Sequence, residues 1–246
     1  MEIIFLGTNG WYDTETGNTP SVLIETEDNY IVCDAGFGFY KLKKYITSDK
    51  PIRLFISHLH YDHIIGLHTL GIFKFKQGID IYIHKKLLTG LRAFLKRPFT
   101  SPPMLLPTKI RFRGITETSH VPVNFKMAKL RHSTSCYGYS FNVENKKISY
   151  CTDTGLCGNL KKLAKNADFL ITECSMSPGE KSLNLFHMTP ETAAAVARDT
   201  GTKQLALIHF DPGKYPLLSD RKKALYAAKL IFTNTIVAED NMTVML

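Results

Sequence analysis

The order of apolar and polar positions along the chain predicts short strands in two blocks, each followed by helices. Runs of β-branched or apolar residues, typical of strands, fall at residues 3–6, 21–26, 30–34, 53–57, 79–83, 139–143, 147–152, 169–172, 204–209, 235–237 and 242–245, and another begins near Val121. Apolar positions at helical spacing fall at residues 64–76, 85–96, 158–165, 189–200 and 220–232. This pattern predicts an α+β fold, in which two sheets pack together with helices outside.

Local signals mark the ends of some of these elements. Thr189, Pro190 and Glu191 predict a helix start, because threonine caps a first turn, proline fits its first position and an acid favours the positive end of the helix. Gly201 predicts the end of that helix. The pair Glu144 and Asn145 predicts a hairpin turn between two strands.

The chain reads as an ordinary globular protein. Its 246 residues contain no short repeat, low-complexity tract or linker, so we expect a single domain over residues 1–246. Apolar residues make up 44% and charged residues 22%, which excludes a disordered, collagen-like or coiled-coil protein. No run approaches the roughly 18 consecutive apolar residues of a membrane span, so no membrane partner is expected.

Cysteine usage and the N-terminus predict a cytoplasmic location. The five cysteines are scattered and odd in number, and none forms a C-x-x-C pair, which favours reduced thiols over a disulfide framework. The first residues lack the basic region of a signal peptide and enter a strand pattern at once.

The positive charge of the chain is concentrated in one segment. Lysine and arginine total 31 against 22 acids, a formal charge of +9, and residues 81–116 contain eight basic side chains and no acid. Four of the eleven prolines fall within residues 98–107. The segment is either a solvated helix face followed by a loop, or a substrate-binding lobe that attracts an anionic partner. Its phenylalanines could stack on bases or pack in the core.

The segment from His58 to His63 carries the strongest chemical signal. His58 and His60 are two residues apart at the end of a strand, so their side chains can converge on one ion. Asp62 and His63 follow where the chain turns into a helix, and can face a second ion. Imidazole and carboxylate ligands suit Zn²⁺, and also Mn²⁺ or Fe.

Three further candidate ligands fall at predicted strand ends. These are His132, Asp153 and His209. Singly, each would more often be a cap or a buried polar residue, but together they complete a set for two metal ions. A carboxylate such as Asp153 can bridge two cations held about 3.5–4 Å apart.

The chain resembles the metallo-β-lactamase superfamily over nearly its full length. His58, His60, Asp62 and His63 match the signature H-x-H-x-D-H of that superfamily. The resemblance implies a four-layer αβ/βα sandwich and two divalent ions, with Zn²⁺ expected. It implies that the first ion is held by His58, His60, His132 and Asp153. It implies that the second is held by Asp62, His63, His209 and the shared Asp153. The resemblance also leaves a homodimer open.

Within the superfamily, the C-terminal half is most similar to the branch of tRNase Z, which trims the 3′ ends of tRNA. In that branch a glutamate orients a histidine that assists the leaving group, and Glu173 and His187 occupy the similar segments. A plainer interpretation of Glu173 is that it forms a salt bridge at a strand end. A plainer interpretation of His187 is that it is a loop residue before a helix. The segment 34–38 lacks the Glu and Gln of that branch, and no clear Gly-Pro-rich arm for tRNA is present.

These observations predict a metal-dependent hydrolase acting on an anionic phosphoester. Asp62 would orient a hydroxide nucleophile, and His187, held by Glu173, would protonate the departing alkoxide. A phosphodiesterase acting on a small or nucleotide-type phosphodiester is preferred, and nucleic acid is the less favoured substrate. The alternatives are a tRNA 3′-processing endoribonuclease, a lactonase or thioester hydrolase on the same scaffold, and a binding protein without turnover.

Overall fold

The computed structural model describes residues 1–181 and 186–246, and the chain divides into two units. The first unit contains Met1–Gly7, Asn18–Ser119 and Asp240–Leu246. The second contains Thr8–Gly17 and His120–Glu239. The first unit is therefore built from both ends of the chain, and the second contains most of the C-terminal half.

The first unit is built on a seven-stranded mixed sheet with the order β13-β1-β2-β3-β4-β5-β6. Its strands are β1 (Glu2–Gly7), β2 (Ser21–Glu25), β3 (Tyr30–Cys33), β4 (Ile52–Ile56), β5 (Ile79–His84), β6 (Ile110–Ile115) and β13 (Thr243–Met245). The pairs from β13 to β3 are antiparallel, and those from β3 to β6 are parallel. Strands β3 and β4 are buried along their whole length, as strands covered on both faces must be.

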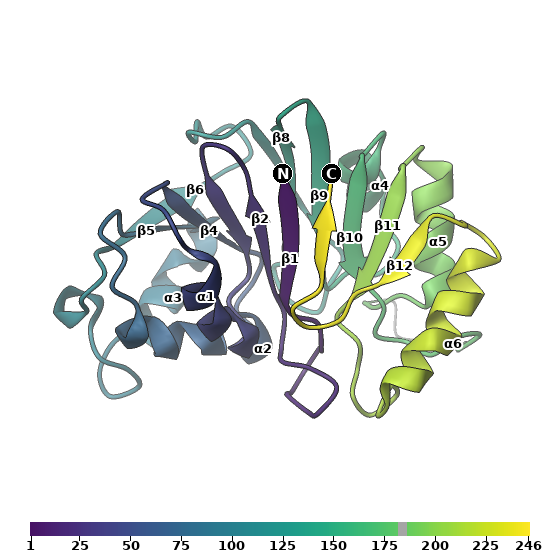
Figure 1. Ribbon diagram of the computed structural model, residues 1–246, viewed down its shortest axis with the longest axis horizontal. Coiled ribbons are helices and arrows are strands. Elements are labelled where there is room, and N and C mark those ends of the chain that lie inside the picture. The colour runs from purple at the N-terminus through teal and green to yellow at the C-terminus, as the bar shows by residue number, and fades with distance from the viewer. Residues whose placement is uncertain (182–185) are drawn as a thin grey trace. The chain divides into compact units, whose positions relative to one another are not determined.

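Short helices lie along one face of this sheet (Figure 1). They are the α-helices α1 (Leu42–Tyr45), α2 (Tyr61–Ile64) and α3 (Leu88–Phe94), with 3₁₀-helices at Phe37–Lys41, Ile65–Ile72, Lys85–Leu87 and Pro103–Leu105. Their apolar side chains, including Phe39, Leu67 and Leu91, are buried with sheet residues such as Leu54 in one core cluster. The metal-signature segment, His58 to His63, begins just after β4 and continues into α2.

The second unit is built on a six-stranded mixed sheet with the order β12-β11-β10-β9-β8-β7. Its strands are β7 (Phe125–Lys129), β8 (Tyr137–Val143), β9 (Lys146–Cys151), β10 (Phe169–Glu173), β11 (Gln204–Ile208) and β12 (Thr235–Val237). The pairs from β7 to β9 are antiparallel, and those from β9 to β12 are parallel. The carboxyl ends of β9, β10 and β11 thus lie at one edge of the sheet, which brings the residues that follow them together.

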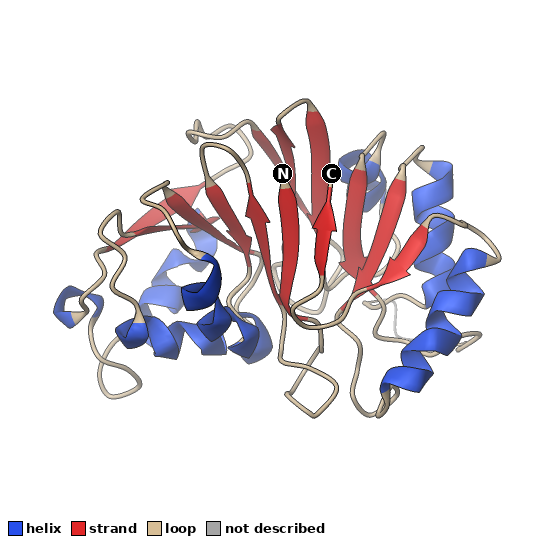
Figure 2. Cartoon of the chain, viewed as in Figure 1, coloured by secondary structure: helices blue, strands red, loops and turns tan. Residues whose placement is uncertain are grey.

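Three helices cover this second sheet: α4 (Gly158–Ala164), α5 (Pro190–Asp199) and α6 (Leu218–Lys229) (Figure 2). The helix start predicted at Thr189 is confirmed, because the Thr189 side chain accepts a hydrogen bond from the Thr192 amide at 3.2 Å. Gly201 ends α5 with a φ of 68°. The hairpin between β8 and β9 turns at Glu144 and Asn145, both with positive φ.

The helix predicted over residues 64–76 differs from the structure. Only Tyr61–Ile64 is α-helical, and the chain continues as a 3₁₀-helix over Ile65–Ile72. Gly66 explains the tight path: its amide donates to the Ala35 carbonyl at 2.9 Å, and a Cβ atom there would lie 2.0 Å from the Gly36 carbonyl oxygen. This close approach holds the metal-signature segment against the loop after β3.

Strand β6 was not predicted, because its sequence includes arginines between apolar residues and does not form an apolar run. None of its residues is buried except Ile115. The strand forms the edge of the first sheet, where such residues are tolerated. Two of its basic residues bind an acid just outside the segment 81–116: Arg111 lies 2.9 Å and Arg113 3.0 Å from the Asp80 carboxylate. These contacts hold the pKa of Asp80 below its usual range despite its partial burial. Asp80 therefore offsets part of the local positive charge.

Two further expectations concern cysteines and membranes. Within the part of the chain that the structure describes, none of the five cysteines forms a disulfide. Among the described residues, no helix is both long and apolar enough to span a membrane.

Candidate metal centre

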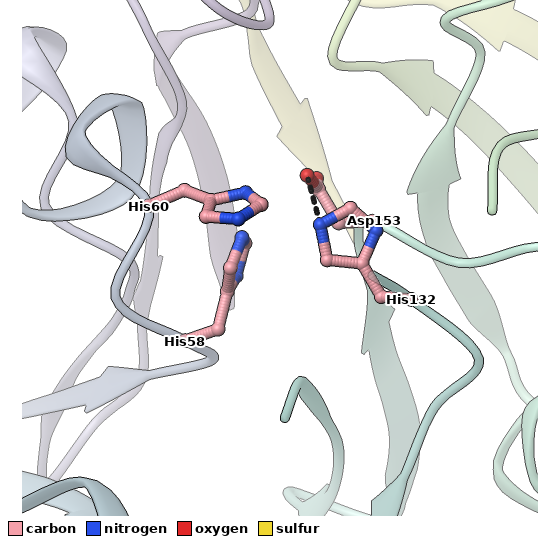
Figure 3. Close-up of side chains that lie close together, drawn as sticks. All are labelled: His58, His60, His132 and Asp153. Atoms are coloured by element: carbon pink, nitrogen blue, oxygen red, sulfur yellow. Dashed lines mark ion pairs between the residues drawn. The ribbon is translucent and has the colours of Figure 1, made fainter. Parts of the chain in front are cut away.

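The first unit gathers the four residues of the predicted metal signature. His58 and His60 follow β4, with ring centroids 4.5 Å apart, and Figure 3 shows this pair. His63, on α2, places its ring 4.2 Å from that of His58. The Asp62 carboxylate lies 3.4 Å from Nε2 of His63. His58 and His63 are fully buried, which is unusual for histidines of a solvated turn.

Asp34, at the end of β3, orients two of these imidazoles. Its carboxylate lies 2.8 Å from Nδ1 of His63, and it accepts hydrogen bonds from the Ser57 amide and hydroxyl, each at 2.7 Å. The same Ser57 hydroxyl lies 2.9 Å from Nδ1 of His58. With Nδ1 held in this way, Nε2 of each ring is the atom placed to bind a metal. No pattern in the sequence had predicted this role for Asp34.

The second unit places Asp153 between two imidazoles. One carboxylate oxygen lies 3.0 Å from Nε2 of His209, and the other lies 3.6 Å from Nε2 of His132. Figure 3 shows the His132–Asp153 pair. All three residues are nearly buried. A carboxylate that presents one oxygen to each of two imidazoles has the arrangement required of a ligand shared by two ions.

Three polar residues that lie one or two positions after a strand adopt the left-handed conformation. The φ angles are 58° for Asp34, 53° for Asp153 and 57° for His209. Such angles cost free energy for residues other than glycine, and they concentrate at functional sites. Each of these residues lies just beyond the end of a strand. Its left-handed backbone turns the chain there, so that the side chain lies at the edge of the sheet.

Ser175 and Gly10 fix the position of His209. The Ser175 hydroxyl lies 3.2 Å from Nδ1 of His209, and Nε2 is thereby directed to Asp153. Gly10 lies so close to the imidazole that a Cβ atom would be 2.5 Å from its Cε1. Arg221 and Asn9 hold this loop in place: Arg221 donates to Thr8 at 2.9 Å and to the Asn9 side chain.

Replacing Gly10 with alanine is expected to displace the His209 ring. Because Ser175 and Asp153 hold that ring, it cannot swing away freely, and we expect metal affinity to fall about 10- to 100-fold. Metal content after dialysis, measured by inductively coupled plasma mass spectrometry, tests this. Gly158→Ala is the matched control, since a Cβ atom there meets nothing within 4 Å. Equal metal retention by both variants would contradict the expectation.

Glu173 and His187 form a pair beside this cluster. Nδ1 of His187 lies 2.8 Å from the Glu173 carboxylate. Glu173 is fully buried and also accepts hydrogen bonds from the amides of Thr154 at 2.7 Å, and of Ser175 and Met188 at 3.2 Å each. The His187 ring stacks on His209 with centroids 6.0 Å apart. The carboxylate is thus fixed by the backbone, and it fixes the imidazole in turn.

Charge surrounds His187 in a way that favours its protonated form. Burial disfavours the imidazolium, but the carboxylates of Glu173 and Asp153 outweigh it and raise the pKa of His187 above its usual range. An imidazole with a raised pKa and one nitrogen held by a carboxylate can donate a proton from the other nitrogen.

The donor atoms within each unit fit divalent metal ions. Imidazole nitrogens and carboxylate oxygens suit Zn²⁺, Mn²⁺ and Fe. Three of the five predicted histidine ligands, His58, His63 and His209, have Nδ1 held by a hydroxyl or carboxylate, as metal-bound histidines usually do. Asp153, His187 and His209 also form a group in the second unit that could hold an ion.

Comparison with known proteins gives matches over most of the chain. The family model described as the beta-lactamase superfamily domain matches residues 29–210, a range that includes every predicted site residue. Ribonuclease Z of Microcystis aeruginosa is 28% identical over 309 aligned positions, covering 99% of this chain and 95% of the relative.

Two solved structures show the same fold. The metallo-beta-lactamase fold protein YhfI from Bacillus subtilis has a TM-score of 0.82 and 20% identity, covering 99% of this chain and 98% of its own. The short form of human tRNase Z has a TM-score of 0.76 and 23% identity, covering 100% and 99%. The predicted α+β metallo-β-lactamase fold, with two sheets and two helical layers, is confirmed.

Proposed function

Because the chain belongs to the beta-lactamase superfamily and is a metal-dependent hydrolase, we propose that it is an endoribonuclease that processes the 3′ end of tRNA precursors. The observation that carries this proposal is the match to Ribonuclease Z over 99% of the chain. The buried Glu173–His187 pair supports it, because a proton donor beside the candidate metal ligands suits the departure of an alkoxide.

This proposal reverses the preference reached from the sequence. A small phosphodiester was preferred over nucleic acid because residues 34–38 and the missing arm depart from the tRNase Z pattern. The relatives named Ribonuclease Z give no support to that preference, since they match the whole chain rather than a few motifs. RNA is therefore the substrate to test first.

A small phosphodiester stays the second candidate on one specific observation. The alignment with the Microcystis relative has 309 positions and this chain has 246 residues, so at least 63 aligned positions have no counterpart here. An enzyme that is shorter by that many residues has less surface with which to hold a large RNA.

We assign the metal ligands as the resemblance to the superfamily implies. His58, His60, His132 and Asp153 would hold one ion, and Asp62, His63, His209 and the shared Asp153 the other. Since these ligands come from both units, the proposal requires the two units to act as one catalytic domain. When bound, divalent ions withdraw charge from phosphoryl oxygens and lower the pKa of water to about 7. A homodimer and a cytoplasmic location stay predictions.

The remaining steps fall to side chains of this chain. Asp62, whose side chain is largely buried, would orient the attacking hydroxide through its carboxylate. His187 would donate a proton from Nε2 to the departing alkoxide, while Glu173 holds Nδ1 and stabilises the imidazolium. The Asp153 carboxylate favours that charge. The His209 ring stacks on the His187 ring and helps to position it.

The proposal is tested with a panel of substrates in the presence of Zn²⁺ or Mn²⁺. A precursor tRNA with a 3′ trailer, a cyclic nucleotide, a bis-aryl phosphodiester and a lactone would be compared by kcat/KM. We expect the precursor tRNA to be cleaved with the highest value. Preferential hydrolysis of the cyclic nucleotide would favour the second candidate, and preferential hydrolysis of the lactone would overturn both.

Salt should weaken RNA binding through the basic segment. Lys96 and Arg97 are exposed after α3, and each phosphate that they contact releases counterions, so KM for RNA should rise with salt. The double variant Lys96→Ala/Arg97→Ala should lower the slope of log KM against log salt by about 1–2. Lys161→Ala/Lys162→Ala, at exposed positions on α4, is the control. Equal slopes in the wild type and both variants would show that Lys96 and Arg97 do not contact the substrate.

A further inference from the structure

A pocket opens beside the metal-signature segment, within the first unit. It has a volume of about 660 Å³, in the range of small-molecule sites. One wall comes from Leu59, Tyr61, Ile65 and His68, and the facing wall from α3 and the turn after it. The Glu173–His187 pair and the metal ligands described above do not line it.

The pocket and the metal-signature residues share one stretch of chain. Leu59 and Tyr61 line the pocket and alternate with His58, His60 and Asp62. Along α2 and the 3₁₀-helix that follows, Tyr61, Ile65 and His68 recur at the spacing of one helix face. A ligand in the pocket therefore lies against the same turn that presents the predicted metal ligands.

Tyr61, Phe94 and Phe99 contribute aromatic rings to the pocket wall, and two of these rings are unusually accessible. The side chains of Tyr61 and Phe99 are 73% and 70% exposed, whereas large apolar residues are normally buried. The Tyr61 ring lies 6.2 Å from that of Phe94. Phe99 is held in an ordered turn, since its amide donates to the Lys96 carbonyl at 2.9 Å. These rings offer flat apolar surfaces to a planar ligand.

The charge and the polar groups around the pocket narrow the ligand class. Lys96 and Arg97 lie between the pocket residues Phe94 and Phe99 in the sequence. Both are exposed, and they supply positive charge. His68 and Thr100 add polar groups to the lining, which can meet the edge of a heteroaromatic ring. A flat aromatic group attached to a phosphate satisfies both features, and a nucleotide is such a molecule.

We infer that this pocket binds a nucleobase of the substrate, next to the phosphodiester that is cleaved. The inference rests on the proposed function and names the part of the substrate that the first unit recognises. Stacking on Tyr61 and Phe99 accepts any base, because every base has a π-face. The pocket would thus select nucleotide-type phosphodiesters without selecting a sequence.

Calorimetric titration of the metal-loaded protein separates the base from the sugar phosphate. We expect adenosine 5′-monophosphate to bind about tenfold more tightly than ribose 5-phosphate, which lacks the base. Phe99→Ala and the pocket-filling Ala93→Trp should abolish this difference and leave the affinity for ribose 5-phosphate unchanged. Tyr226→Ala is the control, because Tyr226 is 69% exposed on α6 in the second unit. Phe99 is exposed, so its variant is expected to fold.

The outcomes distinguish the pocket from the proposed function. Equal affinity for the two ligands, or a difference that survives both substitutions, would overturn the nucleobase pocket. Butyl phosphate binding as tightly as the nucleotide would also overturn it, because the pocket would then take an alkyl group. If the nucleotide shows the expected advantage but precursor tRNA is not cleaved, the pocket stands and the endoribonuclease proposal fails. If precursor tRNA is cleaved but the nucleotide binds no more tightly than ribose 5-phosphate, the endoribonuclease proposal stands and the nucleobase pocket fails.

Discussion

Asp153→Ala is expected to remove metal ions and hydrolysis together. Asp153 presents one carboxylate oxygen to His209 at 3.0 Å and the other to His132 at 3.6 Å, so it is the residue placed to serve two ions. Without it the charge of two cations is poorly compensated, and imidazoles alone bind them more weakly. We expect metal content to fall to less than half and kcat/KM to fall by at least about 10³-fold.

Metal content by mass spectrometry and phosphodiester hydrolysis, measured on the same preparation, test this expectation. Asp199→Ala is the control, because Asp199 is an exposed acid that pairs only locally with Arg198 among the described contacts. Circular dichroism establishes that both variants are folded. A variant at Asp153 that retains metal and turnover would contradict the assignment of Asp153 as the ligand shared by both ions.

His187→Ala is expected to separate metal binding from turnover. His187 is held by Glu173 at 2.8 Å and is assigned as a proton donor rather than as one of the seven ligands. The variant should keep its metal and lose about 10²- to 10⁴-fold in kcat, the usual contribution of a general acid. His120→Ala, at an exposed histidine, is the control. Wild-type turnover by His187→Ala would show that the acid lies elsewhere.

A substitution at Glu173 tests how the proton is held. The carboxylate raises the pKa of His187, so the protonated acid persists to higher pH than an ordinary imidazole would. Activity that depends on this acid is present below that pKa and is lost as pH rises through it. Glu173→Gln should therefore move the alkaline limb of kcat to lower pH. A purely structural role for Glu173 would lower activity without moving that limb.

Most of the fold could be predicted because its strands are short, apolar and bounded by turn residues. The strand Thr235–Val237 has the predicted bounds, and the helix after Thr189 begins where its cap predicts. Strand β6 was missed because an edge strand alternates charged and apolar residues without a buried face on both sides. The path after His63 was missed because Gly66 packs against the loop after β3, a contact between segments 30 residues apart in sequence.

The candidate site was predictable where residues carry their own chemical signal, and less so where they act on others. His58, His60, Asp62 and His63 form a recognisable spacing, and the structure places them together. Asp34 and Ser175 orient imidazoles across long sequence separations, and no local pattern marks them. The aspartate directly after an apolar strand was the available signal for Asp34. The superfamily membership supports the grouping of the two ligand sets into one centre, and the Asp153→Ala variant tests it.

The topology of the first sheet has a consequence for how the protein is made. Strand β1 pairs with β2 on one edge, and on the other with β13, where Glu2 opposes Met245. As the ribosome delivers the chain from its N-terminus, β1 can form its hairpin with β2 early, but its second edge has no strand to pair with until residues 243–245 emerge. Throughout translation that edge is a template for other strands. The nascent chain therefore carries this open edge of β1 until β13 has been made.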